Sequence, residues 1–468
     1  MKFLSTLFFC GLLASAHAAP LPRPVVKALQ QAHIPLSSVG IEVREIKTRT
    51  PLISVHSNNA MNPASTMKLL TTYAGLELLG PAHTWKTEAY LNGQMEQGVL
   101  HGDLILKGYG DPKFTVEQFW LWLRELRSRG LREIQGNLVL DRSAFEPVPH
   151  DPAVFDNEPI RPYNVGSDAL LLNFNAVHLR FIPDGEQIRV ISEPELAGIK
   201  LDNRITPASA AADANVLASC SNWNDTVSAQ LQDDTILLQG SFPAQCGECE
   251  QNVCLIPPPR YLYSVFRALW QEMGGTLQGE MVEGGVPASA TFFSVHHSQP
   301  LGELIRDINK FSNNVMARQL FLSLGGNEEP ASVARSKLVL YKWLAQKKLN
   351  FPELVLENGA GLSRYERISP HNLALLLQSA QHSPFAAEFT ASLPIAGVDG
   401  TLKKRLNGSA MLNQAHLKTG SLEGIKSVAG YVQSRSGKQW VMVFLINHAN
   451  AAAGQPAQDA LIEWLQRQ

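Results

Sequence analysis

Residues 65–74 read Ser-Thr-Met-Lys-Leu-Leu-Thr-Thr-Tyr-Ala, and this stretch organises the interpretation of the whole chain. It reads as a helix that opens at Ser65, with Pro63 just upstream. Side chains three positions apart share one face of a helix, so Lys68 is predicted to lie against Ser65. A serine hydroxyl needs a base to become a nucleophile, and a crowded, partly desolvated lysine can accept its proton. The alternative is a serine N-cap followed by a surface lysine.

A second polar string, Ser312-Asn313-Asn314, interrupts two apolar helical patterns at residues 301–310 and 315–324. Ser312 can pass a proton between Lys68 and a leaving group. Asn314 can donate its amide to a substrate carbonyl and accept from a lysine. The alternative is an ordinary helix–helix turn, because serine and asparagine favour turns.

A third string, Lys418-Thr419-Gly420, lies in the first of three predicted antiparallel strands, at residues 415–420, 427–433 and 439–446. Lys418 and Thr419 would bind an anionic carboxylate, and Gly420 would let the substrate backbone approach closely. The N–H groups of Ser421 and Ser65 can form an oxyanion hole. The alternative is an edge strand that happens to carry lysine and threonine.

The order Ser-x-x-Lys, Ser-x-Asn and Lys-Thr-Gly resembles that of the penicillin-binding proteins. The long stretch 69–311 between the first two strings is similar to the class C low-molecular-mass group, the family typified by penicillin-binding protein 4. Five further segments resemble motifs of that family: 63–66, 108–112, 141–145, 358–364 and 393–402. Ala360 departs from the family's serine at that position, and the resemblance is weakest between about Pro194 and Pro259.

The resemblance implies an α/β (α+β) fold, in which a serine β-lactamase-like catalytic domain has an antiparallel sheet flanked by helices and carries inserted β-rich domains. It implies a serine D-Ala-D-Ala carboxypeptidase with DD-endopeptidase activity, which acts on peptidoglycan stem peptides and crosslinks through an acyl-enzyme on Ser65. β-Lactam antibiotics would acylate the same serine, and no cofactor or metal is expected. The alternatives are a β-lactamase-like hydrolase and a wall-binding protein with a decayed site.

The first residues predict a cleavable signal peptide over 1–18 and therefore a periplasmic location, because Lys2 precedes an apolar run and Ala16-His17-Ala18 forms a small-x-small site. The apolar run is too short for a permanent span, so membrane association is at most peripheral. The net charge of -2 shows no excess of basic residues of the kind that binds nucleic acid.

The remaining chain is predicted to form three domains, of which the catalytic domain is discontinuous. Their expected bounds are 19–84 and 294–468 for the catalytic domain, 85–165 and 259–293 for inserted domain II, and 166–258 for a β-rich domain III nested in domain II.

Domain III contains Cys220, Cys246, Cys249 and Cys254. An even number of cysteines in an exported chain predicts disulfides, with three possible connectivities. We favour Cys220–Cys246 with Cys249–Cys254. A four-cysteine zinc site is the alternative, because Cys246 and Cys249 have knuckle-like spacing.

The stem peptide's third residue is a diamino acid in many cell walls, and in the family an acidic residue from the inserted domain meets its amine. The matching stretch here, residues 155–163, reads Phe-Asp-Asn-Glu-Pro-Ile-Arg-Pro-Tyr and departs from the family pattern. By distance to Tyr163 we choose Glu158 first and Asp156 second. A solvated acidic loop is the alternative.

Overall fold

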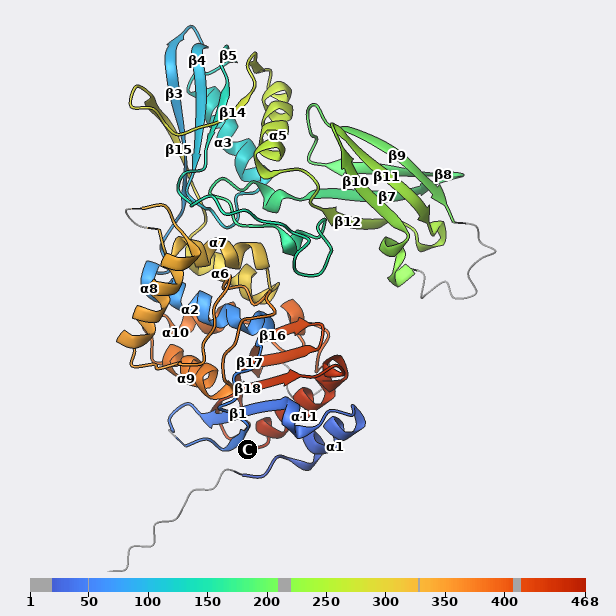
Figure 1. The fold of residues 1–468 in the computed structure, drawn as a ribbon, viewed down its shortest axis with the longest axis vertical. Coiled ribbons are helices and arrows are strands. Elements are labelled where there is room, and N and C mark those ends of the chain that lie inside the picture. Colours follow the sequence, from blue (N-terminus) through green and yellow to red (C-terminus); the bar gives the residue numbers. More distant parts are fainter. Residues whose placement is uncertain (1–18, 49, 209–219, 327–328, 407–413) are drawn as a thin grey trace, which may run out of the picture.

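The structure is a computed structural model that describes residues 19–48, 50–208, 220–326, 329–406 and 414–468. The expected signal peptide, residues 1–18, lies outside the described residues. Figure 1 shows a lower part built from both ends of the chain, an upper part built from its middle, and a green β-rich arm that projects from the upper part.

The lower part is organised by a five-stranded antiparallel sheet in the order β16-β17-β18-β1-β2. Its strands are β1 (Val39–Glu45), β2 (Ile53–Val55), β16 (Ala415–Leu422), β17 (Ile425–Gln433) and β18 (Gln439–Asn447). The N-terminal strand joins the C-terminal hairpin, because Val39 pairs with Ile446 and Glu45 with Trp440. This pairing explains why residues at opposite ends of the chain form one domain.

Helices cover both faces of this sheet, and the strands alternate accordingly. On β18, Phe444 packs with α1 (Arg23–Gln31) and α11 (Gln455–Gln466), whereas Val443 packs with the helices on the other face. The helices of that second face are α2 (Lys68–Leu79), α6 (Leu301–Lys310), α7 (Asn314–Ser323), α8 (Val333–Gln346), α9 (Pro370–Gln381) and α10 (Ala386–Ser392). The expected antiparallel sheet flanked by helices is confirmed.

Helix α2 is the central helix, since every residue from Lys68 to Leu76 is buried. It follows a 3₁₀ turn at residues 64–67 that contacts β16, and Figure 1 shows its blue ribbon beside the red strand. The first and third sequence strings are thereby neighbours in space.

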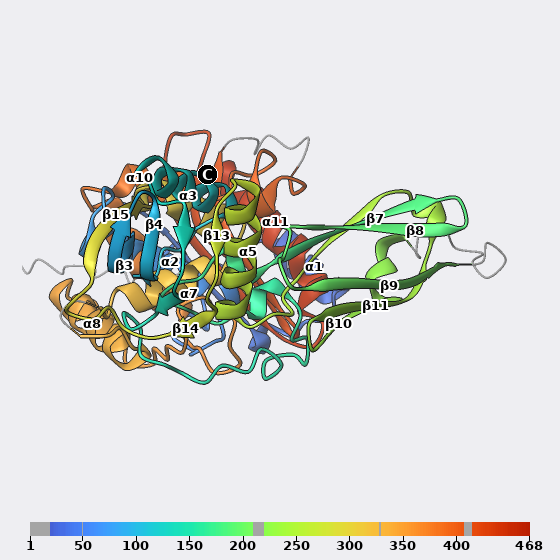
Figure 2. The ribbon, with the colours of Figure 1, turned by 90° about the horizontal axis from the view of Figure 1, so that it is seen from above.

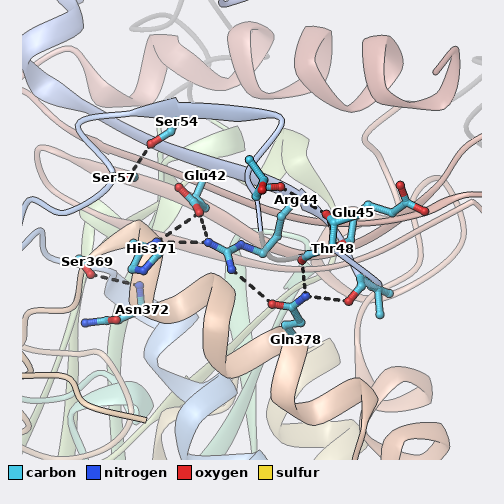
Figure 3. A network of polar contacts seen from close by, with 12 residues as sticks. Glu42, Arg44, Glu45, Thr48, Ser54, Ser57, Ser369, His371, Asn372 and Gln378 are labelled. Atoms are coloured by element: carbon cyan, nitrogen blue, oxygen red, sulfur yellow. Dashed lines mark hydrogen bonds and ion pairs between the residues drawn. The ribbon is translucent and has the colours of Figure 1, made fainter. Parts of the chain in front are cut away.

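A buried polar network holds β1 against α9 (Figure 3). Arg44 on β1 forms an ion pair with Glu42, and its guanidinium lies 3.3 Å from Gln378 Oε1 and 3.2 Å from His371 Nδ1. Removing one partner would leave a buried charge uncompensated, so these contacts fix the spacing between the strand and the helix.

The upper part contains a seven-stranded sheet, covered by α3 (Val116–Ser128) and α5 (Pro258–Glu272). Its strands are β3 (Lys86–Glu96), β4 (Val99–Gly108), β5 (Glu133–Ile134), β6 (Leu138–Asp141), β13 (Thr276–Leu277), β14 (Met281–Glu283) and β15 (Thr291–His297).

The domain boundary expected at 294 is wrong, because it cuts β15, which pairs with β3 along residues 86–91. The chain crosses between the two parts at Trp85 and Ser298. The backbone N–H of Trp85 donates to the hydroxyl oxygen of Ser298 at 3.0 Å. We therefore propose 85–297 as the inserted region, with the arm nested inside it.

The arm consists of two three-stranded sheets, β12-β7-β8 and β10-β11-β9 (Figure 2). Its strands are β7 (Val177–Asp184), β8 (Gln187–Glu193), β9 (Lys200–Pro207), β10 (Val227–Gln232), β11 (Thr235–Phe242) and β12 (Cys249–Val253). Between the sheets, the rings of Phe181 and Phe242 stack with centroids 5.8 Å apart, and Trp223 packs against both.

The cysteines of the arm correct half of the predicted pairing. Cys220 and Cys246 form a disulfide with Cα atoms 5.4 Å apart, so a zinc site made of all four thiolates does not form. Cys249 and Cys254 are free. Cys249 is the first residue of β12 and Cys254 follows its last residue, so their Cα atoms are roughly 16 Å apart at the usual rise of a strand. A disulfide needs Cα atoms within about 7 Å.

Among the helices of the described residues, none is both long enough and apolar enough to cross a bilayer.

Candidate active site

Ser65 lies in the 3₁₀ turn that precedes α2, not at the start of the α-helix itself. The preceding residue, Ala64, has a φ of 47°, a left-handed conformation that is uncommon for a residue with a side chain. Lys68 Nζ nevertheless lies 2.9 Å from Ser65 Oγ, because a 3₁₀ turn also brings residues three apart together. The sequence spacing therefore produces a serine–lysine contact.

Lys68 is fully buried, and its ammonium has three hydrogen-bond acceptors: Ser65 Oγ, Asn314 Oδ1 at 2.6 Å, and the carbonyl oxygen of Ala360. Burial, and next the positive charge of Lys418, hold the pKa of Lys68 well below its usual value, while the buried Glu366 acts in the opposite direction. A lysine whose pKa is lowered in this way gives up its proton more easily than an exposed lysine and can serve as a base.

A second buried lysine, Lys418, is hydrogen-bonded to Ser312. Lys418 Nζ donates to Ser312 Oγ at 2.8 Å and to the carbonyl oxygen of Thr419 at 2.7 Å. Burial lowers the pKa of Lys418 to about 7. Ser312 has a φ of 58°, and Asn313 caps α7 by accepting from the N–H of Met316. Uncommon backbone conformations of this kind often occur at functional sites, where a side chain such as that of Ser312 is held in one direction.

The depressed pKa of Lys418 predicts a pH-dependent effect on stability. Between about pH 7 and the ordinary lysine value of 10.5, the unfolded chain binds more protons, so the free energy of unfolding rises with pH in this window. Below about pH 7 the folded protein carries a buried charge that costs stability. Lys418→Met should therefore be more stable than the wild type at pH 6, and this difference should shrink toward pH 10. Urea unfolding of both proteins at several pH values would test it, and a difference that grows with pH would contradict it.

Eight of the predicted residues meet at one place: Ser65, Lys68, Ser312, Asn314, Lys418, Thr419, Gly420 and Ser421. A cavity of about 290 Å³ opens there. Its lining consists of Ser65, Ser312, Thr401, Arg405, Thr419, Gly420, Ser421, Lys426 and Gln455. The hydroxyls of Thr419 and Thr401 are 2.7 Å apart, so hydrogen-bonding groups converge on this space.

Gly420 lies close to the backbone of residues 63–65, whereas the sequence predicted that it would let the substrate backbone approach. A Cβ at this position would lie 2.8 Å from the nitrogen of Ser65 and 2.9 Å from the carbonyl oxygen of Pro63. The neighbouring Ser427 donates to that same carbonyl at 2.7 Å. The glycine thus lets β16 press directly against the backbone of the nucleophile turn.

A loop at residues 357–361 packs against Ser65 and Lys68. One carboxylate oxygen of the buried Glu366 accepts the N–H groups of Glu357, Asn358 and Gly359 at 2.9–3.0 Å. Burial raises the pKa of this carboxyl. The loop then offers the Ala360 carbonyl to Lys68, so the family's serine side chain is not needed for this contact. Glu366 was not among the residues predicted from the sequence, because no local pattern marks a carboxylate that accepts the backbone N–H groups of a loop.

Gly361 should be indispensable to this loop. It has a φ of +80°, and a Cβ there would overlap the carbonyl oxygen of Ala64 and lie 2.8 Å from the nitrogen of Ser65. Gly361→Ala should lose at least about 3 kcal/mol of stability and slow acylation. Gly437→Ala is the matched control, because it has a φ of +82° with nothing within 4 Å, and should lose only about 1 kcal/mol. Equal losses in thermal unfolding would show that the contact with the nucleophile turn is unimportant.

Asp156 and Glu158 are not part of this cluster. Asp156 accepts from the Tyr163 hydroxyl at 2.8 Å and from Asn164 at 2.7 Å, and Glu158 forms an ion pair with Arg161. Neither carboxylate lines the cavity at Ser65. Their loop continues to Arg161 and Tyr163, which line a separate cavity of about 750 Å³ together with Ser312 and Asn314.

The chain matches the family described as the D-Ala-D-Ala carboxypeptidase 3 (S13) family over residues 22–468. It is 28% identical over 440 residues to a D-alanyl-D-alanine carboxypeptidase of Actinomadura sp. (strain R39), covering 90% of this chain and 80% of that protein. It is 25% identical over 423 residues to the D-alanyl-D-alanine carboxypeptidase DacB of Haemophilus influenzae, covering 88% and 85%.

Among solved structures, penicillin binding protein 4 from Haemophilus influenzae superposes with a TM-score of 0.80 at 24% identity, covering 95% of this chain and 99% of that one. A predatory peptidoglycan endopeptidase from Bdellovibrio bacteriovorus gives a TM-score of 0.52 at 17% identity, covering 91% and 92%. At these identities the two structures establish the shared fold.

Proposed function

The chain belongs to the D-Ala-D-Ala carboxypeptidase 3 (S13) family, and on that premise we propose that Ser65 is the serine acylated by peptidoglycan stem peptides. The resemblance found in the sequence is thereby confirmed at the level of family, and the protein is a serine-type D-Ala-D-Ala carboxypeptidase. The observation that carries the assignment of Ser65 is the 2.9 Å contact with the fully buried Lys68.

In the acylation step, the neutral amine of Lys68 takes the proton from Ser65 Oγ, and this oxygen attacks the carbonyl carbon of the penultimate D-Ala. The backbone N–H groups of Ser65 and Ser421 donate to the developing oxyanion. Asn314 uses Oδ1 for Lys68, which turns its amide nitrogen toward a substrate carbonyl.

Collapse of the tetrahedral intermediate breaks the bond between the carbonyl carbon and the nitrogen of the terminal D-Ala. Ser312 gives its hydroxyl proton to that departing nitrogen and takes one from Lys418, which contacts it at 2.8 Å. Water then attacks the acyl-enzyme and releases the shortened peptide. In deacylation the attacking water returns a proton to Ser312 and Lys418, and Lys68 returns its proton to Ser65. A crosslink contains the same D-Ala carbonyl joined to another amine, so DD-endopeptidase activity uses the same steps, and β-lactams acylate Ser65 as analogues of the substrate amide.

The finer features of the biological setting are part of the proposal. The substrates are stem peptides and crosslinks in the periplasm, reached after removal of the segment 1–18, and any membrane association is peripheral. The assignment of the substrate's side-chain amine to Glu158, with Asp156 second, stays a prediction, and it requires displacement of the Arg161 partner.

Incubation of the purified protein with disaccharide-pentapeptide and crosslinked muropeptides, followed by mass analysis, tests the proposal. Loss of one alanine from the pentapeptide and cleavage of the crosslinked dimer are the expected products. A fluorescent penicillin should label the protein in a long-lived complex. Rapid turnover of the penicillin without attack on muropeptides would instead favour the β-lactamase-like alternative, and absence of labelling would favour a decayed site.

A further inference from the structure

A half-buried lysine, Lys426, lines the cavity beside Ser65. Lys426 lies on β17 directly opposite Ser421 on β16, and its Nζ donates to Ser421 Oγ at 2.9 Å. Its side chain is half-buried and lines the cavity. Within the described part of the chain, no carboxylate lies close enough to Lys426 to form an ion pair.

The other basic residue of the cavity wall is already engaged. Arg405 is mostly buried and forms an ion pair with Asp459 on α11. Burial, and then the charge of Arg405, lower the pKa of Lys426. The carboxylate of Asp459 acts in the opposite direction. Because Lys426 is half-buried beside a second positive charge, a carboxylate that enters the cavity would stabilise its charged form.

Lys418, the lysine that the sequence suggested for the substrate carboxylate, faces a different direction. It is fully buried, its ammonium donates to Ser312 and to the Thr419 carbonyl, and it does not line the cavity. A carboxylate in the cavity would therefore meet the hydroxyls of Thr419 and Ser421 and the ammonium of Lys426.

We propose that Lys426 is the cation that binds the carboxylate of the leaving amino acid, together with the hydroxyls of Ser421 and Thr419. This inference rests on the proposed carboxypeptidase function and adds a specificity-determining residue to it. The terminal D-Ala carries a free carboxylate on the carbon next to its nitrogen. Where the crosslinking residue is a diamino dicarboxylic acid, its side-chain amine also has a carboxylate on the adjacent carbon, so one subsite serves both kinds of leaving group.

The proposal predicts a selective loss of preference for acids. We would compare a peptide ending in D-Ala-D-Ala as the free acid with the same peptide as its carboxamide. Lys426→Met should lower the ratio of kcat/KM for acid over amide by about tenfold or more, mainly through KM, because a hydrogen-bonded charge pair is lost. Lys426→Arg should keep most of the ratio, and Lys426→Gln serves if the methionine variant does not fold.

Lys404→Met is the matched control, since Lys404 is exposed next to Arg405 and outside the cavity lining, and its ratio should equal that of the wild type. Thermal unfolding reports that each variant is folded, and labelling by fluorescent penicillin at saturating concentration reports that Ser65 is still reactive. An unchanged ratio in Lys426→Met, or an equal loss on acid and amide, overturns the proposal. A wild-type protein that releases neither D-Ala from the acid nor D-alaninamide from the amide overturns the proposed function. This result is obtained with the wild type alone, so it is separate from the comparison of variants.

Discussion

Ser65→Ala should abolish release of D-Ala and covalent labelling by penicillin, with a loss of at least about 10⁴-fold in kcat. The Ser65 hydroxyl is the nucleophilic oxygen, which Lys68 contacts at 2.9 Å, and without it no acyl bond can form. Ser65 is only partly buried, and the change removes a single hydroxyl, so the melting temperature should remain close to that of the wild type.

Intact-mass measurement after incubation with penicillin is the direct readout, because acylation adds the mass of the antibiotic. Ser128→Ala, at the exposed end of α3 in the upper part of the molecule, is a control that should label fully. Persistent labelling of the Ser65 variant would assign the nucleophile to another residue and remove the basis of the mechanism.

Lys68→Met should slow acylation by roughly 10³-fold, within the range expected for loss of a general base. Methionine fills most of the lysine's volume, which limits the cavity that alanine would leave in the buried α2. The wild-type acylation rate should rise with pH as Lys68 loses its proton, beginning well below the ordinary lysine range because the pKa is lowered. The variant should lose this rise.

Stopped-flow measurement of penicillin acylation across pH would test both statements, and Lys404→Met provides a lysine-to-methionine control outside the site. Acylation by Lys68→Met at the wild-type rate would show that another group accepts the serine proton. An unchanged pH profile with a lowered rate would indicate that Lys68 positions Ser65 instead of deprotonating it.

The sequence by itself determined the features that depend on short spacing or on periodicity. The contact between Ser65 and Lys68 follows from their separation of three residues, which holds in a 3₁₀ turn as it does in an α-helix. The apolar face of residues 301–310 predicted α6 with the observed bounds. The C-terminal segments predicted the β16–β17–β18 hairpins, because alternation of apolar and polar residues with a period of two can be recognised in the sequence.

Only the tertiary structure decided which groups complete the site. Ala360 contributes a backbone carbonyl, which every residue possesses, and Glu366 acts through backbone N–H groups, so neither role has a signature in residue identity. Lys426 reaches the cavity because the register of β16 and β17 sets it opposite Ser421. The sequence contains both residues but does not specify which direction their side chains face.

The corrected predictions have the same physical origin. Cys249 and Cys254 are close in sequence, but the strand between them holds them apart, and the boundary at 294 failed because β15 pairs with β3, about 200 residues earlier in the chain. The prediction for Asp156 and Glu158 is not among these corrections: both carboxylates hydrogen-bond within their own loop, and their contact with a substrate amine stays a prediction. Local spacing determined the contact between Ser65 and Lys68. Pairing between distant segments determined which other residues line the cavity where a substrate would bind.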